Sequence, residues 1–296
     1  MGSDIDGTVN TDIYPGYVFD MFISYPVTED DSEGGIAMKN KVILVSIDGM
    51  RPDGVQSCGN PYVQKLMEMG SYTMDAQTVF PSVTLPCHMS LFHSVTPERH
   101  GITTNTYMVQ VRPINGLFEQ ISAAGGVSAM YYGWEPLRDV ARPGSLKFAG
   151  YLNAYAEDAT DGKLTDLALD RMAKSHPDFV FLYMVETDEK GGHDNGWMSD
   201  AYLGYISAAI DNVKRVYEAF GDEYTILVTA DHGGHDRSHG SDLPEDTTIP
   251  MFFIGERFTP GKELDGVTIL DLAPTAADIM GVPCAPEWEG HSLANT

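Results

Sequence analysis

Asp231 and His232 stand side by side shortly after an apolar, β-branched run at residues 226–228, which predicts a buried strand. Gly233 and Gly234 follow, and they let the backbone turn tightly around a bound group. Ligands of open α/β sheets bind outside the carboxyl ends of the strands. A carboxylate and an imidazole at such an end suit a cation better than a core, so this stretch is a candidate metal site. For an isolated pair, a hydrogen-bonded turn would be the commoner explanation.

Two more apolar runs, residues 42–47 and 179–185, end in side chains of the same kind. Asp48 and a glycine follow the first run, while the second leads into Asp188 and, across a glycine-bearing loop, His193. An Asp that ends a strand is by itself a common turn residue. Because three strand ends carry matching chemistry, we expect them to meet at one edge of a sheet.

Thr84 lies at or near the N-terminus of a predicted apolar helix that has Pro86 in its first turn. The ordinary role of a hydroxyl there is to cap the helix, which contributes about 1 kcal/mol. The same position also offers backbone N–H groups and the positive end of the helix dipole, both of which favour an anion. Beside bound metal ions, the Thr84 hydroxyl could therefore serve as a nucleophile.

Together these segments supply three carboxylates, three imidazoles and one hydroxyl. An open catalytic zinc site takes about three protein ligands such as Asp and His. Two metal ions roughly 3.5–4 Å apart stabilise both the attacking and the leaving oxygen of an in-line displacement. The inventory therefore predicts two-metal phosphoryl transfer. Its members are Asp48, Thr84, Asp188, His193, Asp231, His232 and His239.

The rest of the chain must bring these residues to one edge of a sheet. Strand patterns alternate with helix patterns, which predicts an α/β fold: a three-layer sandwich with a central, mostly parallel sheet and a small cap around residues 106–160. Strands are expected at 42–47, 71–79, 127–132, 179–185, 226–228 and 248–254, and helices at 61–69, 89–93, 116–124, 161–174, 199–220 and 271–280.

The chain has 296 residues, 43% of them hydrophobic, which suits one large α/β domain, expected over residues 39–296. Residues 1–38 differ from the rest because they contain eight acidic residues and no Lys or Arg. We expect them to form an acidic leader, either a remnant of expression or a natural extension, that takes no part in the chemistry.

The formal net charge of −25 argues against a nucleic-acid-binding surface and against attraction to an anionic membrane. No apolar run approaches the length of a membrane span, and no basic-then-apolar signal peptide opens the sequence. The three cysteines are widely spaced, which argues against a disulfide framework. These features predict a cytoplasmic protein that acts on a small molecule.

Several motifs, in this order, resemble those of the alkaline phosphatase superfamily, and the most similar branch is the type I phosphodiesterase/nucleotide pyrophosphatase group. They are V-S-I-D-G-M-R-P-D, F-P-S-V-T-L-P-C-H with H-G-I-T-T-N, E-T-D-E-K-G-G-H and T-A-D-H-G. The closing I-L-D-L-A-P-T-A-A-D-I-M-G-V-P also resembles the superfamily's C-terminal segment. The motifs are much more specific in combination than singly.

The resemblance implies two divalent metal ions, with zinc expected and manganese used in some branches. One ion would be held by Asp48, Asp231 and His232, with the Thr84 oxygen bound to it. The other ion would be held by Asp188, His193 and His239.

The resemblance also implies that Thr84 is the nucleophile and that the reaction passes through a covalent phosphothreonine. Asn105, which matches the Asn of H-G-I-x-x-N, would hydrogen-bond a non-bridging phosphate oxygen. The implied activity is hydrolysis of a phosphodiester or pyrophosphate bond in a small molecule, with a nucleotide as one candidate.

Two ligand positions leave alternatives open. The related loop has the spacing D-x-x-x-H, which Glu189 and His193 keep, whereas Asp188 lies five residues before His193. We favour Asp188 because the E-T-D motif aligns it with the strand end, and Glu189 is the alternative ligand. Of the two histidines after His232, we favour His239 in R-S-H-G over His235.

The substrate pocket is the least determined part of the site. Residues 134–155 are irregular and rich in aromatic residues and arginine, which fits either a pocket wall or ordinary core and surface. From this segment and the loop before it we select Tyr107, Trp134 and Arg138 as candidate substrate-binding residues.

Three other functions are weaker alternatives. A phosphomonoesterase or phosphonate hydrolase could use the same metal site, and Arg138 or Arg142 would then supply an extra cation for the dianion. A sulfatase needs a C-x-P-x-R motif, whereas the sequence here is Thr84-Leu85-Pro86-Cys87-His88. A metal-binding module without activity would have no need to retain the nucleophile.

Overall fold

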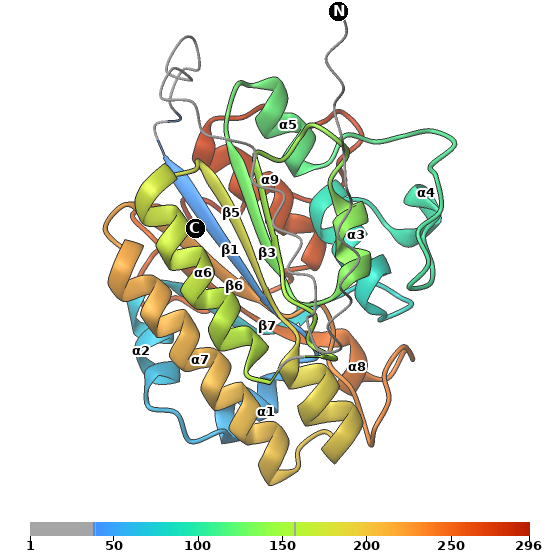
Figure 1. Cartoon of the computed structure of the whole chain (residues 1–296), viewed down its shortest axis with the longest axis vertical. Coiled ribbons are helices and arrows are strands. Elements are labelled where there is room, and N and C mark those ends of the chain that lie inside the picture. The colour runs from blue at the N-terminus through green and yellow to red at the C-terminus, as the bar shows by residue number, and fades with distance from the viewer. Residues whose placement is uncertain (1–37, 39, 157) are drawn as a thin grey trace, which may run out of the picture.

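A seven-stranded sheet with the order β2-β7-β6-β1-β5-β3-β4 forms the centre of the computed structural model, which describes residues 38, 40–156 and 158–296 (Figure 1). Strands β6, β1, β5, β3 and β4 are parallel to one another, and β7 runs antiparallel to both of its neighbours. The predicted mostly parallel sheet is therefore confirmed. The strands are β1 (Lys41–Ile47), β2 (Ser71–Gln77), β3 (Ser128–Tyr132), β4 (Phe148–Tyr151), β5 (Phe179–Met184), β6 (Tyr224–Thr229) and β7 (Thr248–Ile254).

The register of the three central strands places their carboxyl ends together. Ile47 of β1 is paired with Met184 of β5, and Ser46 of β1 is paired with Thr229 of β6. These strands consist almost entirely of apolar residues, as expected for strands that are covered on both faces. Whatever follows each strand therefore emerges at the same edge of the sheet.

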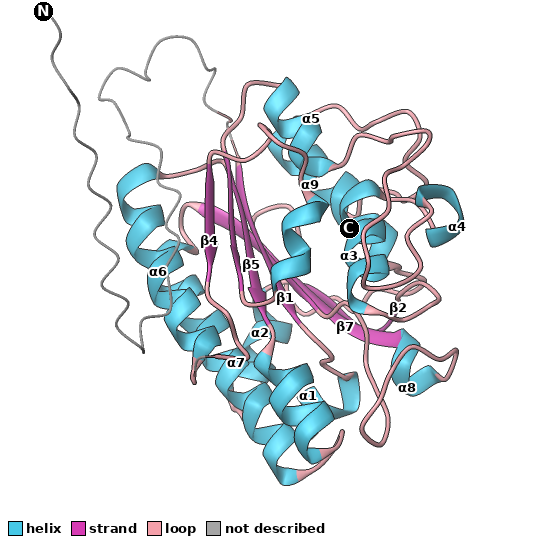
Figure 2. Cartoon of the chain, turned by 45° about the vertical axis from the view of Figure 1, so that its right-hand side comes forward, coloured by secondary structure: helices cyan, strands magenta, loops and turns pink. Residues whose placement is uncertain are grey.

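Helices cover both faces of the sheet, which confirms the three-layer architecture (Figures 1 and 2). One layer contains α1 (Pro52–Ser57), α2 (Tyr62–Met69), α6 (Thr160–Ser175) and α7 (Asp200–Phe220). The other contains α3 (Thr84–His93), α5 (Leu117–Ala123) and α9 (Leu272–Met280). Short elements complete the described chain: α4 (Pro97–His100), α8 (Pro244–Thr247), the 3₁₀ turns η1 (Glu135–Val140) and η3 (Ile269–Asp271), and the π-helical turn η2 (Thr187–His193).

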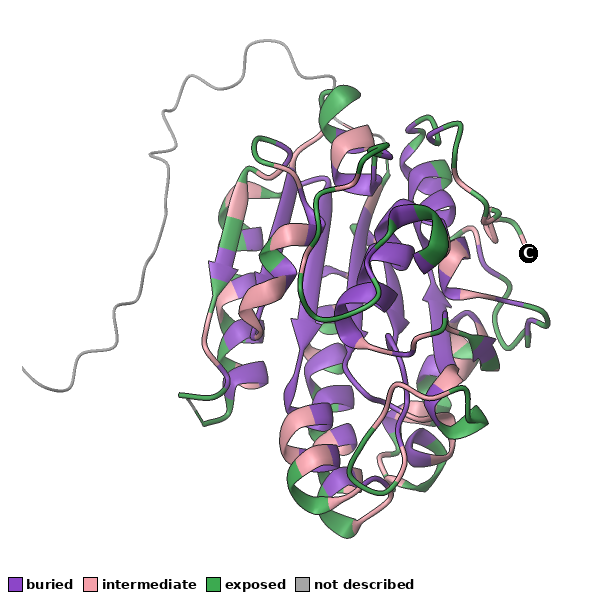
Figure 3. Ribbon diagram, turned by 90° about the vertical axis from the view of Figure 1, so that its right-hand side faces the viewer, coloured by how far each residue is buried: buried purple, intermediate pink, exposed green. Residues whose placement is uncertain are grey.

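Helix α7 illustrates how the sequence produces these layers. Its hydrophobic side chains recur every three or four residues and form one buried face, as an amphipathic helix requires. Ser199 caps the helix, and its side chain accepts a hydrogen bond from the backbone N–H of Tyr202. The buried residues lie between the layers, while the outer faces of the helices are exposed (Figure 3).

Most of the segment at 106–160 does not form the small cap that we expected. Strands β3 and β4 belong to the central sheet, and α5 packs in the same layer as α3 and α9. β4 could not be recognised from the sequence because it has only four residues, three of which are partly or fully exposed. Only the connecting loops of this segment remain available to cover the site. The predicted acidic leader lies outside the described residues except for Met38, which packs against the core.

Across the described ranges, no helix combines the length and the apolar character needed to cross a bilayer.

We expect Phe181→Ala to lower the free energy of unfolding by about 3–5 kcal/mol, because it would leave a cavity in the core. Phe181 of β5 is fully buried, and its ring meets that of Phe92 edge-on at a centroid distance of 4.9 Å. Denaturant-induced unfolding would measure the loss. Val111→Ala, at a residue that is 97% exposed, should change stability by less than about 0.5 kcal/mol. A loss below about 1 kcal/mol for Phe181→Ala would contradict the central position given to β5.

Candidate metal centre

The three central strand ends bring Asp48, Asp188 and Asp231 together in the interior, where each residue is at most 5% exposed. Gly49, which follows Asp48, donates its backbone N–H to Asp231 Oδ1 at 3.3 Å. A side chain at Gly49 would put its Cβ 2.9 Å from Asp188 Oδ1, and the residue has a φ of +67°. Only glycine fits this turn, so the close approach of the carboxylates depends on it.

Asp48, Asp231 and His232 form the first group of potential metal ligands. The His232 Nε2 atom lies 3.2 Å from Asp48 Oδ1 and 3.4 Å from Asp231 Oδ2. The same nitrogen is 3.2 Å from the hydroxyl oxygen of Thr84. The nucleophile candidate therefore faces this group directly.

Asp188, His193 and His239 form the second group. The Nε2 atoms of His193 and His239 lie 3.4 Å from Asp188 Oδ2 and 3.9 Å from Asp188 Oδ1, respectively. In each of the two groups the potential ligand atoms all lie within 4.8 Å of one another. Both groups match the ligand sets that the resemblance implied.

The π-helical turn η2 explains why Asp188, and not Glu189, joins this group. A π-helix is wider than an α-helix and forms hydrogen bonds between residues five apart. The backbone N–H of Asp194 accordingly bonds to the carbonyl of Glu189, and residues five apart, such as Asp188 and His193, lie on one side of the turn. Glu189 belongs to neither ligand group and accepts a hydrogen bond from the hydroxyl of Tyr155 at 3.2 Å.

All three histidines of the two groups are held in one orientation by the backbone. In each, Nδ1 donates to a main-chain carbonyl, which leaves the lone pair of Nε2 for a cation. This is the arrangement that metal-binding histidines usually have. The accepting oxygens belong to Gly233 for His232 (2.8 Å), Arg237 for His193 (3.0 Å) and Ser82 for His239 (2.9 Å). The two groups also touch, because the rings of His232 and His239 stack at 3.9 Å.

The carboxylates of this centre lack compensating positive charge. Burial, together with repulsion from Asp231, holds the pKa of Asp48 and Asp188 well above the usual range. Burial also tends to raise the pKa of Asp231, but the neighbouring His232 and His88 have the opposite and larger effect, so that the pKa of Asp231 is lowered. Within the described chain, Asp48 Oδ1, Asp188 Oδ1 and Asp231 Oδ2 have no hydrogen-bond partner. Divalent cations would satisfy all three oxygens, so the residues fit a two-metal centre.

Thr84 is the first residue of α3, and Val83 occupies the N-cap position. The Thr84 hydroxyl therefore does not cap the helix and is directed at His232. Asn105 lies beside it, because its Oδ1 accepts a hydrogen bond from the backbone N–H of Leu85 at 3.0 Å. The amide nitrogen of Asn105 is left free to donate toward the cavity.

A small cavity of about 70 Å³ opens in front of Thr84 and Asn105. Trp134 lines it, as predicted. Tyr107 and Arg138, which we also expected to bind substrate, do not. Tyr107 packs against the core, and Arg138 lies farther along η1, where it pairs with Glu135 and lines a different pocket.

Several residues of this centre were not predicted from the sequence. Tyr155 and Val185 line the cavity, as does Glu189, which we had considered only as an alternative metal ligand. Tyr183 donates its hydroxyl to Asp48 Oδ2, and a tyrosine at the end of an otherwise apolar strand was the signal that could have revealed it. His88 was signalled by its position four residues after Thr84, whose carbonyl its Nδ1 approaches to 2.8 Å.

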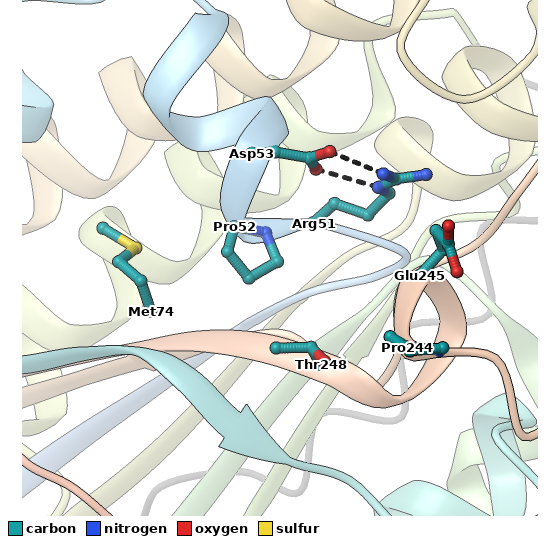
Figure 4. Close-up of a pocket in the computed structure, with 7 residues that line it drawn as sticks. All are labelled: Arg51, Pro52, Asp53, Met74, Pro244, Glu245 and Thr248. Carbon is teal, nitrogen blue, oxygen red and sulfur yellow. Dashed lines mark hydrogen bonds and ion pairs between the residues drawn. The ribbon is translucent and has the colours of Figure 1, made fainter.

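A second pocket, of about 270 Å³, is lined by residues at the start of α1, by Met74 of β2 and by residues of α8 and the start of β7 (Figure 4). Arg51 faces it, but both carboxylate oxygens of Asp53 hold its guanidinium. The Arg51 Nη1 atom also donates to the carbonyl of Gly234 at 2.8 Å. Arg51 therefore supports the loop that carries His232, which gives the arginine of the D-G-M-R-P-D motif a structural role.

The sequence is similar to those of several known proteins. The chain is 30% identical over 145 residues to the 2,3-bisphosphoglycerate-independent phosphoglycerate mutase of Clostridioides difficile, a match that covers 44% of this chain and 26% of the relative. It is 23% identical over 217 residues to ectonucleotide pyrophosphatase/phosphodiesterase family member 1 of Mus musculus, covering 64% of this chain and 24% of the relative. The matches thus span about a quarter of the length of these curated relatives.

Solved structures share the fold. Murine ectonucleotide pyrophosphatase/phosphodiesterase 5 superimposes with a TM-score of 0.71 at 15% identity, over 84% of this chain and 96% of that one. The phosphonate monoester hydrolase of Silicibacter pomeroyi gives 0.69 at 16% identity, over 86% of this chain and 76% of that one. Residues 42–247, which include every residue of both ligand groups, match the family described as type I phosphodiesterase / nucleotide pyrophosphatase, and the chain belongs to that family.

Proposed function

We propose that this chain is a two-metal hydrolase that cleaves phosphodiester or pyrophosphate bonds in small molecules such as nucleotides, with Thr84 as the nucleophile. The observation that carries the proposal is the pair of three-ligand groups that meet beside the hydroxyl of Thr84 at the N-terminus of α3. Asp and His ligands suit zinc, which is the expected metal.

Two divalent ions bound by these groups would favour the alkoxide of Thr84 and offset the negative charge of the phosphate. The Thr84 oxygen would attack phosphorus as the bond from phosphorus to the leaving oxygen breaks, which gives a phosphothreonine. Attack of water on the same phosphorus would then release the product and restore Thr84. The relative solved in complex with AMP is an inactive variant with a threonine replaced by alanine, which supports this role.

Asn105 would hold the phosphate during both steps. Its Oδ1 is engaged by the N–H of Leu85, so its amide nitrogen can donate to a non-bridging oxygen. The free N–H groups in the first turn of α3 would act in the same direction, because the helix dipole is positive at that end. Donors fixed in this way stabilise charge that develops on the phosphate.

The charge of the cavity favours a diester over a monoester. A dianionic monoester would need a further cation, and of the described residues that line the cavity none is Lys or Arg. Arg138 pairs with Glu135, and Arg142 donates to Asn115 Oδ1 at 2.8 Å, so both candidate cations are engaged elsewhere. Glu189 adds negative charge instead. The alternative of a phosphomonoesterase or phosphonate hydrolase has less support.

The two ligand groups predict separate losses of metal. His232→Ala and His239→Ala should each bind one ion where the unmodified chain binds two, because they belong to different groups. Elemental analysis of dialysed protein would count the ions. His176→Ala is the control, since His176 is an exposed histidine that pairs with Glu223. Retention of two ions by either site variant would contradict the ligand assignment.

Thr84→Ala should lower kcat by about 10³-fold or more while both ions stay bound, because the attacking oxygen is removed. Thr84→Ser should keep part of the activity, since only a methyl group is lost. Cys87→Ala, one turn farther along α3, should keep near-normal kcat. Steady-state kinetics and mass spectrometry of acid-quenched enzyme, which would detect phosphothreonine, test this. Near-normal turnover by Thr84→Ala would overturn the nucleophile assignment.

The substrate preference can be measured with chromogenic esters. We expect kcat/KM for bis(p-nitrophenyl) phosphate to exceed that for p-nitrophenyl phosphate by about tenfold or more, which corresponds to about 1.4 kcal/mol. A chelator should abolish both reactions, and added zinc should restore them. A ratio in favour of the monoester would support the alternative function, and turnover that survives metal removal would exclude the two-metal mechanism.

A further inference from the structure

We propose that Trp197 is the positioning residue of the metal centre: its indole fixes the three loops that carry the ligands and sets the orientation of His193 and His239. The inference rests on the proposed binding of two ions. Trp197 lies between η2 and α7, is 7% exposed, and belongs to neither ligand group.

The indole first fixes the loop after β1. Its Nε1–H donates to the carbonyl of Gly49 at 2.9 Å. Gly49 follows the ligand Asp48, and its N–H holds Asp231. Tyr202 donates its hydroxyl to the same carbonyl at 2.8 Å, so loss of the indole N–H would not leave this buried acceptor unpaired.

The indole ring also fills the space between the other two ligand loops. A Cβ at Gly192 would lie 2.5 Å from Trp197 Cζ2, and a Cβ at Gly234 would lie 2.1 Å from Trp197 Cε2. Both distances are far below van der Waals contact, so both positions require glycine while the indole is present. Gly192 immediately precedes His193, and Gly234 follows His232 by two residues.

The second ligand group depends on this ring more directly than the first. The rings of His193 and His239 meet the indole at centroid distances of 5.2 and 6.0 Å, both edge-on. The backbone N–H of Trp197 also donates to the carbonyl of Asp236 at 2.9 Å, next to Arg237, whose carbonyl orients His193. The side chain of His193 is 34% exposed, so few other groups restrain it.

Trp197→Phe tests the inference because it keeps an aromatic ring but removes the N–H and part of the indole. Outer groups that orient metal ligands typically change metal affinity by about 10- to 100-fold. We expect Trp197→Phe to bind the ion of the second ligand group, Asp188, His193 and His239, at least about tenfold less tightly, while the affinity for the ion of the first group changes by less than about threefold. Competition with a chromogenic zinc chelator, with elemental analysis, would measure both.

Trp288→Phe is the matched control, because Trp288 also donates its indole N–H to a backbone carbonyl, that of Asn115 at 2.8 Å, but among the described residues its ring contacts no histidine of the ligand groups, as that of Trp197 does. It should bind both ions as the unmodified chain does. Equal affinities in the unmodified chain and Trp197→Phe, or an equal loss in Trp288→Phe, would overturn the inference.

Gly192→Ala provides a second route if Trp197→Phe does not fold. The added methyl group would displace the indole without removing it, and the same selective loss of one ion is expected. Unchanged metal binding in folded Gly192→Ala would count against the inference as well. These outcomes are distinct from failure of the proposed function, in which the unmodified chain itself would bind no metal.

Discussion

Mutual repulsion among three buried carboxylates is the constraint on which the rest of this structure depends. Folding buries Asp48, Asp188 and Asp231 at the ends of adjacent parallel strands. An uncompensated charge costs several kcal/mol or more in such a place. Within the described ranges no Lys or Arg pairs with these carboxylates, and the three imidazoles of the two groups lie beside them instead. The three carboxylates can all be ionised at low energetic cost only when cations are bound. The strands, turns and imidazoles hold the potential ligand atoms where such cations would bind.

Backbone hydrogen bonds and strand pairing set the positions of most side chains in the candidate metal centre. Each imidazole of the two ligand groups is oriented by a carbonyl, and each carboxylate follows a strand whose register is set by the ladder of its neighbours. The nucleophile candidate stands at the start of a helix rather than on a loop. Sites built in this way hold their geometry better than sites built on mobile segments. Loops contribute the cavity wall, where precision matters less and variation is tolerated.

The sequence predicted the sheet and the ligand positions because both produce local signals. Continuous apolar runs mark central strands, and an Asp directly after such a run is visible without any tertiary contact. Arg138 and Tyr107 were misplaced because nothing local specifies which side of an irregular segment faces a cavity. Likewise, β4 is too short and too exposed to show a strand period. The choice between Asp188 and Glu189 depended on a π-helical turn, which spacing rules derived from α-helices do not anticipate.

The pairing of Gly49 with Asp231 has a consequence for biosynthesis. The two residues are 182 positions apart in the chain, and β1 lies between β5 and β6, which are made much later. Until β5 has been made, a nascent chain therefore holds β1 as an apolar strand with both edges unpaired, and until β6 has been made one of those edges remains without its partner strand. The first group of potential ligands cannot assemble before Asp231 and His232 have been made.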